Sequence, residues 1–96
     1  MAINLTVIIK SKSENIEKLK SLLLDIVQNS KKEAACIQYD LHQSKEEPNT
    51  FIFHEIWKNQ NGLDNHNQQS YIQSFFEISK PLLLQTPILY KTEKLG

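Results

Sequence analysis

Apolar and polar residues alternate at the start of the chain. Ile3, Leu5, Val7 and Ile9 fall on one face of an extended segment over residues 3–9, the period-2 pattern of a half-buried strand. The spacing then changes to that of a helix, whose apolar stripe consists of Ile16, Leu19, Leu23, Ile26 and Val27. We expect this helix to be capped by Ser11 or Ser13 and to end near Ser30.

Two further strands are predicted over residues 36–43 and 50–57, joined by the turn sequence SKEEPN. A short turn between two strands predicts an antiparallel hairpin. One face of the second strand carries Phe51, Phe53, Glu55 and Trp57, and the other carries Ile52, His54 and Ile56. Both faces are largely apolar, so we expect neither to be left fully to water.

The C-terminal third predicts two helices and a strand. Asn59 is a good N-cap for a short helix over residues 60–67. Ser70 is predicted to cap a longer helix, which Pro81 should kink or end because proline lacks a backbone donor. The segment ILYKTEKL, which follows Pro87, predicts a final and more exposed strand.

This order of elements is β-α-β-β-α-β. It predicts a single domain over residues 1–96 with a ferredoxin-like α+β fold, in which helices cover one face of a four-stranded antiparallel sheet. The other sheet face would still need cover. Symmetric dimers are the commonest oligomers, so we expect a homodimer with the two sheets packed face to face.

Composition narrows the function classes. Lys plus Arg equals Asp plus Glu at 11 each, which argues against nucleic acid or an anionic membrane as the main partner. No apolar run approaches a membrane span, and the N-terminal segment lacks the order of a signal peptide. A single cysteine, Cys36, excludes an internal disulfide and makes a cytoplasmic location the expectation.

His66 is the first candidate for chemistry. It lies three residues after Leu63, the one strongly apolar residue of the short helix, so both should face inward. A neutral imidazole there could accept a proton near neutral pH, or it could be a structural histidine bonded to a backbone carbonyl. His42 and His54 come from different strands, and no histidine pair has metal-ligand spacing, so we expect no metal site.

Five other side chains are candidates for the same site. Glu55 stands on an apolar strand face, where its pKa would rise unless the carboxylate reaches solvent or a lysine. Trp57 could line a pocket or be plain core. Asn4 could bind a ligand or face the other side of the pleat, and Tyr39 and Tyr71 could each offer a phenol to a ligand.

Four motifs occur in a fixed order along the chain. They are E-x-x-C-x-x-Y from Glu33 to Tyr39, F-x-x-x-E-x-W from Phe51 to Trp57, L-x-x-H from Leu63 to His66 and S-Y-x-x-x-F from Ser70 to Phe75. With these motifs the chain resembles the antibiotic biosynthesis monooxygenase (ABM) domain family over nearly its whole length.

The resemblance implies a dimeric α+β barrel and a cofactor-free monooxygenase acting on a small aromatic phenol, quinol or anthrone-like compound. Within this family pattern His66 is the candidate base, and Tyr71 and Glu55 are further catalytic candidates. The substrate-binding candidates are Asn4, Tyr39, Phe53, Trp57 and Phe75.

The chain departs from the family pattern at two positions. Ala35 stands where the family often has glycine, so the local backbone is expected to differ if that turn needs a positive φ. Tyr71 stands where the family commonly has a second histidine. Two alternatives therefore remain: a non-catalytic dimeric module that binds a small apolar ligand, and an isomerase like some neighbours of the family.

Overall fold

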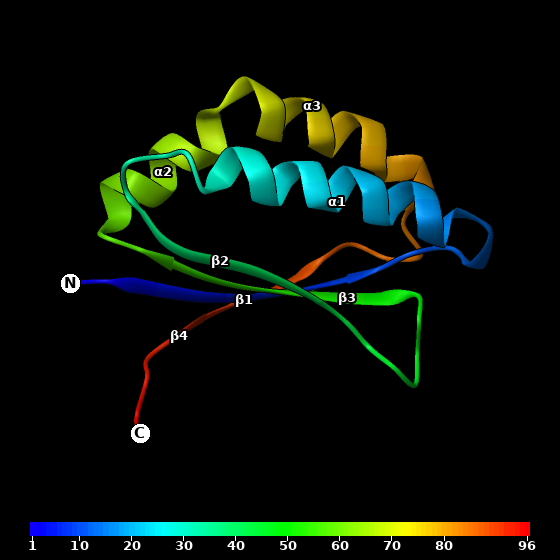
Figure 1. Ribbon diagram of the computed structural model, residues 1–96, viewed down its shortest axis with the longest axis horizontal. Coiled ribbons are helices and arrows are strands. Elements are labelled where there is room, and N and C mark those ends of the chain that lie inside the picture. Colours follow the sequence, from blue (N-terminus) through cyan, green and yellow to red (C-terminus); the bar gives the residue numbers. More distant parts are fainter.

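A four-stranded antiparallel sheet carries all the helices on one face in the computed structural model, which describes residues 1–96 (Figure 1). The strands are β1 (Ile3–Lys10), β2 (Cys36–Gln43), β3 (Thr50–Trp57) and β4 (Ile88–Thr92), in the spatial order β2-β3-β1-β4. The helices are α1 (Ile16–Ser30), α2 (Gln60–Gln68) and α3 (Ser70–Ser79), with 3₁₀ turns at Ser13–Asn15 and Lys80–Leu82. This is the ferredoxin-like α+β fold that the sequence predicts.

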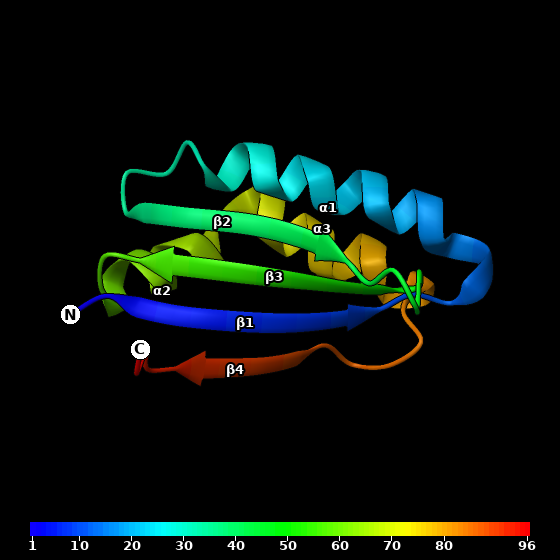
Figure 2. The same cartoon turned by 60° about the horizontal axis from the view of Figure 1, so that its bottom comes forward.

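Strand pleat separates the sheet into a covered and an open face (Figure 2). On the helix side, β3 buries Phe51, Phe53 and Trp57, and Trp57 is wholly inaccessible to solvent. On the other side Ile52 and Ile56 stay partly accessible, because the chain has no further element to cover them. Register pairs Val7 of β1 with Phe53 of β3, so the apolar positions of neighbouring strands lie on the same face.

The start of α1 differs from the prediction. Ser11 is completely buried and forms an isolated bridge with Leu83, and its hydroxyl donates to the Lys12 carbonyl. Neither Ser11 nor Ser13 therefore caps α1. The chain passes through a 3₁₀ turn first, and Asn15 occupies the N-cap position without a side-chain hydrogen bond.

The two later helices follow the predicted boundaries closely. Asn59 caps α2 as predicted, because its Oδ1 accepts a hydrogen bond from the Gly62 backbone N–H at 2.8 Å. Ser70 is the first helical residue of α3 rather than its cap, and Gln69 holds the cap position. Pro81 lies in the 3₁₀ turn after α3, where the regular helix has ended.

The last strand is the least protected element. All five residues of β4 are exposed, and the strand pairs only with β1 at the edge of the sheet. None of the helices is long and apolar enough to cross a membrane.

Candidate functional site

A cavity of about 860 Å³ lies between the helices and the sheet. Its walls come from the helix side of all four strands, from α1, α2 and α3, and from the segment that follows α3. Hydrophobic side chains make up 12 of its 21 lining residues. The polar groups include His66, Glu55 and Tyr39, so most of the cavity is apolar and a few hydrogen-bonding groups meet within it, as in small-molecule sites.

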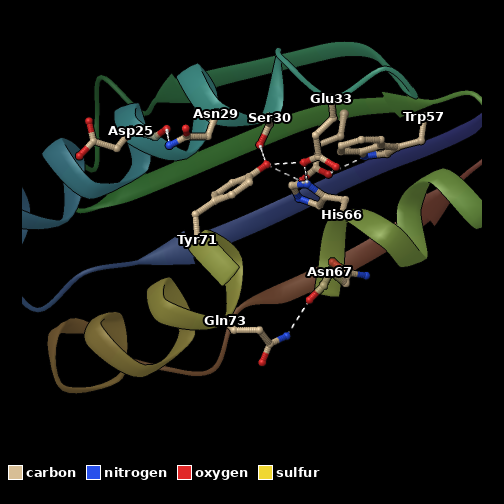
Figure 3. Close-up of polar contacts among 10 residues, drawn as sticks. Asp25, Asn29, Ser30, Glu33, Trp57, His66, Asn67, Tyr71 and Gln73 are labelled. Carbon is tan, nitrogen blue, oxygen red and sulfur yellow. Dashed lines mark hydrogen bonds and ion pairs between the residues drawn. The ribbon is translucent and has the colours of Figure 1, made fainter. Parts of the chain in front are cut away.

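The side chains of His66, from α2, and Glu33, from the turn after α1, meet beside the cavity. Leu63 and His66 both point inward from α2, with 5% and 3% of their surfaces exposed, as their spacing predicts. Glu33 comes from the turn that follows α1, where its N–H binds the Ser30 carbonyl at 3.0 Å and its own carbonyl accepts from the Cys36 N–H at 3.0 Å. Both backbone bonds hold the Glu33 side chain toward α2 (Figure 3).

The imidazole of His66 is held in one orientation. Its Nδ1 lies 2.6 Å from Oε2 of Glu33, and a carboxylate accepts, so Nδ1 carries the proton. No protein group binds Nε2, and the chain leaves no fully buried side-chain nitrogen or oxygen without a partner. Nε2 therefore reaches accessible space, and His66 lines the cavity. Burial lowers the pKa of His66, although Glu33 acts in the opposite direction. The lowered pKa favours the neutral imidazole.

Tyr71 lies behind His66 rather than in the cavity. Its hydroxyl donates to Oε2 of Glu33 and lies 3.2 Å from the Ser30 hydroxyl and 3.3 Å from Nδ1 of His66. Burial, and then the bond to Glu33, raise the pKa of Tyr71 above its usual range, so the phenol stays protonated and donates. Tyr71 does not line the cavity. Its hydroxyl instead helps to hold the Glu33 carboxylate against His66.

Glu55 is buried inside the fold. Only 5% of its surface is exposed, and its Oε1 accepts a hydrogen bond from Nε1 of Trp57 at 2.9 Å. The alternative that Glu55 reaches solvent or a lysine is therefore wrong. Burial raises the pKa of Glu55 to about 7, although hydrogen bonds from Trp57 and Tyr39 act against that rise. Because Glu55 lines the cavity, a carboxyl group with a pKa of about 7 faces that space.

Trp57 supports the site without lining it. Its ring lies against that of His66, with centroids 4.4 Å apart, and its N–H holds Glu55. The side chain is completely buried and is absent from the cavity lining. Trp57 therefore contacts the two cavity-lining residues His66 and Glu55, and its role as a substrate contact stays a prediction.

The remaining predicted residues divide by sheet face. Tyr39, Phe53 and Phe75 line the cavity as predicted, and the rings of Tyr39 and Phe53 pack with centroids 4.9 Å apart. Asn4 does not, because it precedes the inward-facing Leu5 and the pleat turns it to the open face of the sheet. Asn4 is therefore not part of the His66 cavity.

The three histidines do not form one site. The rings of His42 and His54 lie 5.5 Å apart and belong to strand positions that face away from the helices. His66 lies on the helix side, and no group of three His, Cys, Asp or Glu side chains in the chain could hold a metal ion together.

Glu33 is the site residue for which the sequence reasoning assigned no role. Its only signal was its place at the head of the E-x-x-C-x-x-Y motif. A carboxylate in a turn between a helix and a strand shows no periodicity that would reveal an inward direction. Its contacts with His66 and Tyr71 depend on how α1, α2 and α3 pack.

Known proteins share this chain's sequence pattern and fold. The family model described as antibiotic biosynthesis monooxygenase matches residues 3–78. A Bacillus subtilis protein, YcnE, named as a candidate monooxygenase, is 35% identical over 85 residues, which cover 88% of this chain and 90% of that protein. An uncharacterised Synechocystis protein is 36% identical over 92% of this chain, which spans 59% of that relative's length. A crystal structure from Pseudomonas aeruginosa, 27% identical, covers 99% of this chain and 95% of its own with a TM-score of 0.93.

Proposed function

Because the chain belongs to the antibiotic biosynthesis monooxygenase family, we propose that it is a cofactor-independent monooxygenase that oxidises a small aromatic phenol, quinol or anthrone-like compound with molecular oxygen. The cavity supports an aromatic ligand, since its walls are mainly apolar and include the rings of Tyr39, Phe53 and Phe75. The reaction needs no bound cofactor if the deprotonated substrate itself gives electrons to oxygen.

The observation that carries the proposal is the contact between Glu33 and His66. A carboxylate on Nδ1 fixes the imidazole tautomer and leaves the lone pair of Nε2 free to accept a proton from a ligand in the cavity. The same carboxylate stabilises the imidazolium that forms when Nε2 takes the proton. Tyr71 and Ser30 hold this arrangement through their own hydroxyl contacts.

The chemistry balances for an anthrone-type methylene group. His66 removes one proton from the carbon, and the resulting carbanion reduces oxygen and forms a carbon–oxygen bond. Loss of the second hydrogen from that carbon then gives a carbonyl, and the other oxygen atom leaves as water with both hydrogens. Glu55, where it is protonated, is the acid in the cavity that can donate a proton to the departing oxygen.

We also propose that the working unit is a cytoplasmic homodimer formed by sheet-to-sheet packing, which would close a dimeric α+β barrel. The partly accessible isoleucines on the open sheet face support it, namely Ile8, Ile52 and Ile56. A second copy of the same face would remove them from water. The single cysteine supports the proposed location, because it leaves the chain without an internal disulfide.

Oxygen uptake by metal-free protein tests the proposed reaction. Wild type, His66→Ala and Glu33→Gln would be measured with a panel of hydroquinones, naphthoquinols and anthrones, each corrected for autoxidation. Loss of a general base typically costs roughly 10²- to 10⁴-fold in rate, so we expect kcat/KM of His66→Ala to fall by at least about 100-fold. In Glu33→Gln the pKa of His66 should fall further, because Glu33 raises it, and the acidic limb of the pH–rate profile should move to lower pH.

Asn65→Ala is the control, since Asn65 is an exposed residue of α2 next to His66 that lies outside both the cavity lining and the open sheet face. Its uptake should equal that of wild type. Uptake that is accelerated equally by wild type and His66→Ala would remove His66 as the base. Absence of acceleration over the whole panel would favour the non-catalytic binding module, provided that the same compounds bind.

A further inference from the structure

The cavity is long and has two chemically different ends. Along β1 its floor runs from Leu5 to Ile9, which is four residues and therefore about 13 Å in an extended strand. Leu5 pairs directly with Glu55 of β3, so the Leu5 end is the end of the acid–base groups. Between the two ends the lining is apolar, with Val7 and Phe53 paired across the strands.

The far end is lined by the segment that follows α3. Backbone bonds tie this segment to the end of β1, from Lys12 N–H to the Leu82 carbonyl at 2.9 Å and from Leu84 N–H to the Lys10 carbonyl at 2.8 Å. Figure 2 shows this arrangement, with the chain after α3 turning beside the end of β1. Three polar residues of the segment line the cavity, namely Lys80, Gln85 and Thr86. The anchoring bonds hold the backbone of this segment beside the end of β1, and the three polar side chains themselves are exposed.

The charges along the cavity are unequally distributed. Glu55 is the one acidic residue in the lining, and it lies at the Leu5 end. Lys91 pairs with Leu5 at that same end, and its ammonium donates to Oε1 of Gln60 at 2.7 Å. Lys80 has no ion-pair partner, because the one ion pair in the chain joins His66 and Glu33. The far end therefore holds the exposed ammonium group of Lys80, which has no ion-pair partner, beside two neutral polar side chains. No acidic residue of the lining lies at this end.

We infer that the cavity binds an elongated aromatic molecule carrying a carboxylate group, with that carboxylate at Lys80 and the group to be oxidised at His66. This substrate class rests on the proposed function for the reacting end. Gln85 and Thr86 would donate further hydrogen bonds to the carboxylate, and the apolar middle would hold fused rings. Lys80 is thus a specificity-determining residue that positions the substrate along the cavity.

Binding of an oxidised probe, which cannot turn over, tests the proposed carboxylate site at Lys80. Anthraquinone-2-carboxylate and anthraquinone-2-carboxamide have the same ring system and differ in charge. Trp57, the only tryptophan, lies buried against His66, so quenching of its fluorescence reports a ligand at the reacting end. The variants are Lys80→Met, Lys91→Met and the control Lys18→Met, which removes an equal charge from the exposed surface of α1.

We expect wild type to bind the carboxylate about fivefold more tightly than the carboxamide, the size of a partly exposed ion pair of about 1 kcal/mol. Lys80→Met should abolish that preference and leave carboxamide binding unchanged, while Lys18→Met and Lys91→Met should keep it. Raising the salt concentration should weaken only the carboxylate complex.

Equal affinity of the two probes for wild type would overturn the inference, and so would a preference that Lys91→Met abolishes and Lys80→Met retains. The oxygen-uptake assay is independent of this result. Probe preference without any oxygen uptake would reject the proposed reaction and keep the carboxylate site, whereas uptake without charge preference would reject the carboxylate site and keep the reaction.

Discussion

The rings of His66 and Trp57 pack together, and each ring binds one carboxyl group. His66 binds Glu33 and Trp57 binds Glu55, and the two carboxyl groups differ in their surroundings. Glu33 lies in a turn and binds Nδ1 of His66 and the Tyr71 hydroxyl. Glu55 lies near the end of β3, is buried inside the fold, and accepts a hydrogen bond from Nε1 of Trp57. Burial therefore raises the pKa of Glu55 to about 7, which suits this carboxyl group to an acid role near neutral pH.

The raised pKa of Glu55 predicts a pH-dependent stability. The folded protein binds this proton up to about pH 7, whereas the unfolded chain releases it near 4.5. Stability from this group is therefore full below pH 4.5 and is lost as pH rises through 7. The change amounts to about 3 kcal/mol, since one pKa unit is worth about 1.4 kcal/mol. Urea unfolding from pH 4.5 to 8 should show Glu55→Gln gaining stability relative to wild type as pH rises.

Glu46→Gln is the control for that series, because Glu46 is an exposed carboxylate in the turn between β2 and β3. Its stability difference from wild type should stay nearly constant over the same pH range. All samples need one protein concentration, since the proposed dimer would make apparent stability depend on concentration. A pH-independent difference between wild type and Glu55→Gln would show that Glu55 titrates alike in both states.

At the scale of elements, α2 is positioned by a close approach to the turn between α1 and β2. A Cβ added at Gly62 would lie 2.4 Å from Cβ of Ala35, closer than two carbon atoms can approach. The Lys58 N–H also binds the Ala35 carbonyl at 2.9 Å. No residue has a positive φ, so the turn at Ala35 does not need the positive φ that a glycine there would provide. The need for a glycine lies at position 62, where α2 begins.

Gly62→Ala should destabilise the fold and displace α2. Overpacking of this kind typically costs about 1–3 kcal/mol, and here it would also push His66 away from Glu33. We expect a lower urea midpoint and a larger loss of His66-dependent oxygen uptake than stability alone explains. Removing the opposing Cβ with Ala35→Gly should restore much of both losses in the double variant.

Asn61→Ala is the control, because Asn61 is an exposed residue in the same turn of α2. It should leave the free energy of unfolding within about 0.5 kcal/mol of wild type, as for most surface substitutions. A cost of Gly62→Ala that persists unchanged in the double variant would place the clash somewhere other than Ala35.

At the scale of the whole molecule, the sheet has one face without helices (Figure 1). That face is mixed, with isoleucines at positions 8, 52 and 56 beside polar residues such as Thr6 and His54. Its apolar residues lie across the central strands β1 and β3, where a second copy would bury them. The polar residues would need partners in such an interface, because a buried polar group without a hydrogen bond is costly.

Light scattering at micromolar concentration tests this interface. We expect a mass of twice the 11.2 kDa chain for wild type. Ile52→Lys should give the mass of a single chain, since it places a charge in the centre of the open face. Ile78→Lys makes the same change at an exposed position of α3 and should leave the mass unchanged. A single-chain mass for wild type would reject the dimer.

Most helices and strands could be predicted from the local pattern of apolar and polar residues. Strands β2 and β3 have the predicted bounds, and α1 ends at Ser30 as expected, because two-residue and 3.6-residue periods are written directly in the order of apolar side chains. The inward direction of His66 was predicted for the same reason, from its spacing to Leu63. Helix starts were less predictable: Ser11 has the capping side chain but is used in a bridge to Leu83, which is distant in sequence.

The order of elements, the fold class and the family motifs could be read from the sequence, since all of these depend on residues close together in the chain. Which of the candidate residues meet depends on how distant parts of the chain pack. The tertiary structure brought Glu33 to His66 across 33 positions, set Tyr71 and Trp57 behind the cavity, and turned Asn4 to the opposite face. These outcomes depend on the packing of three helices on a sheet, and packing distances are not encoded in any local period.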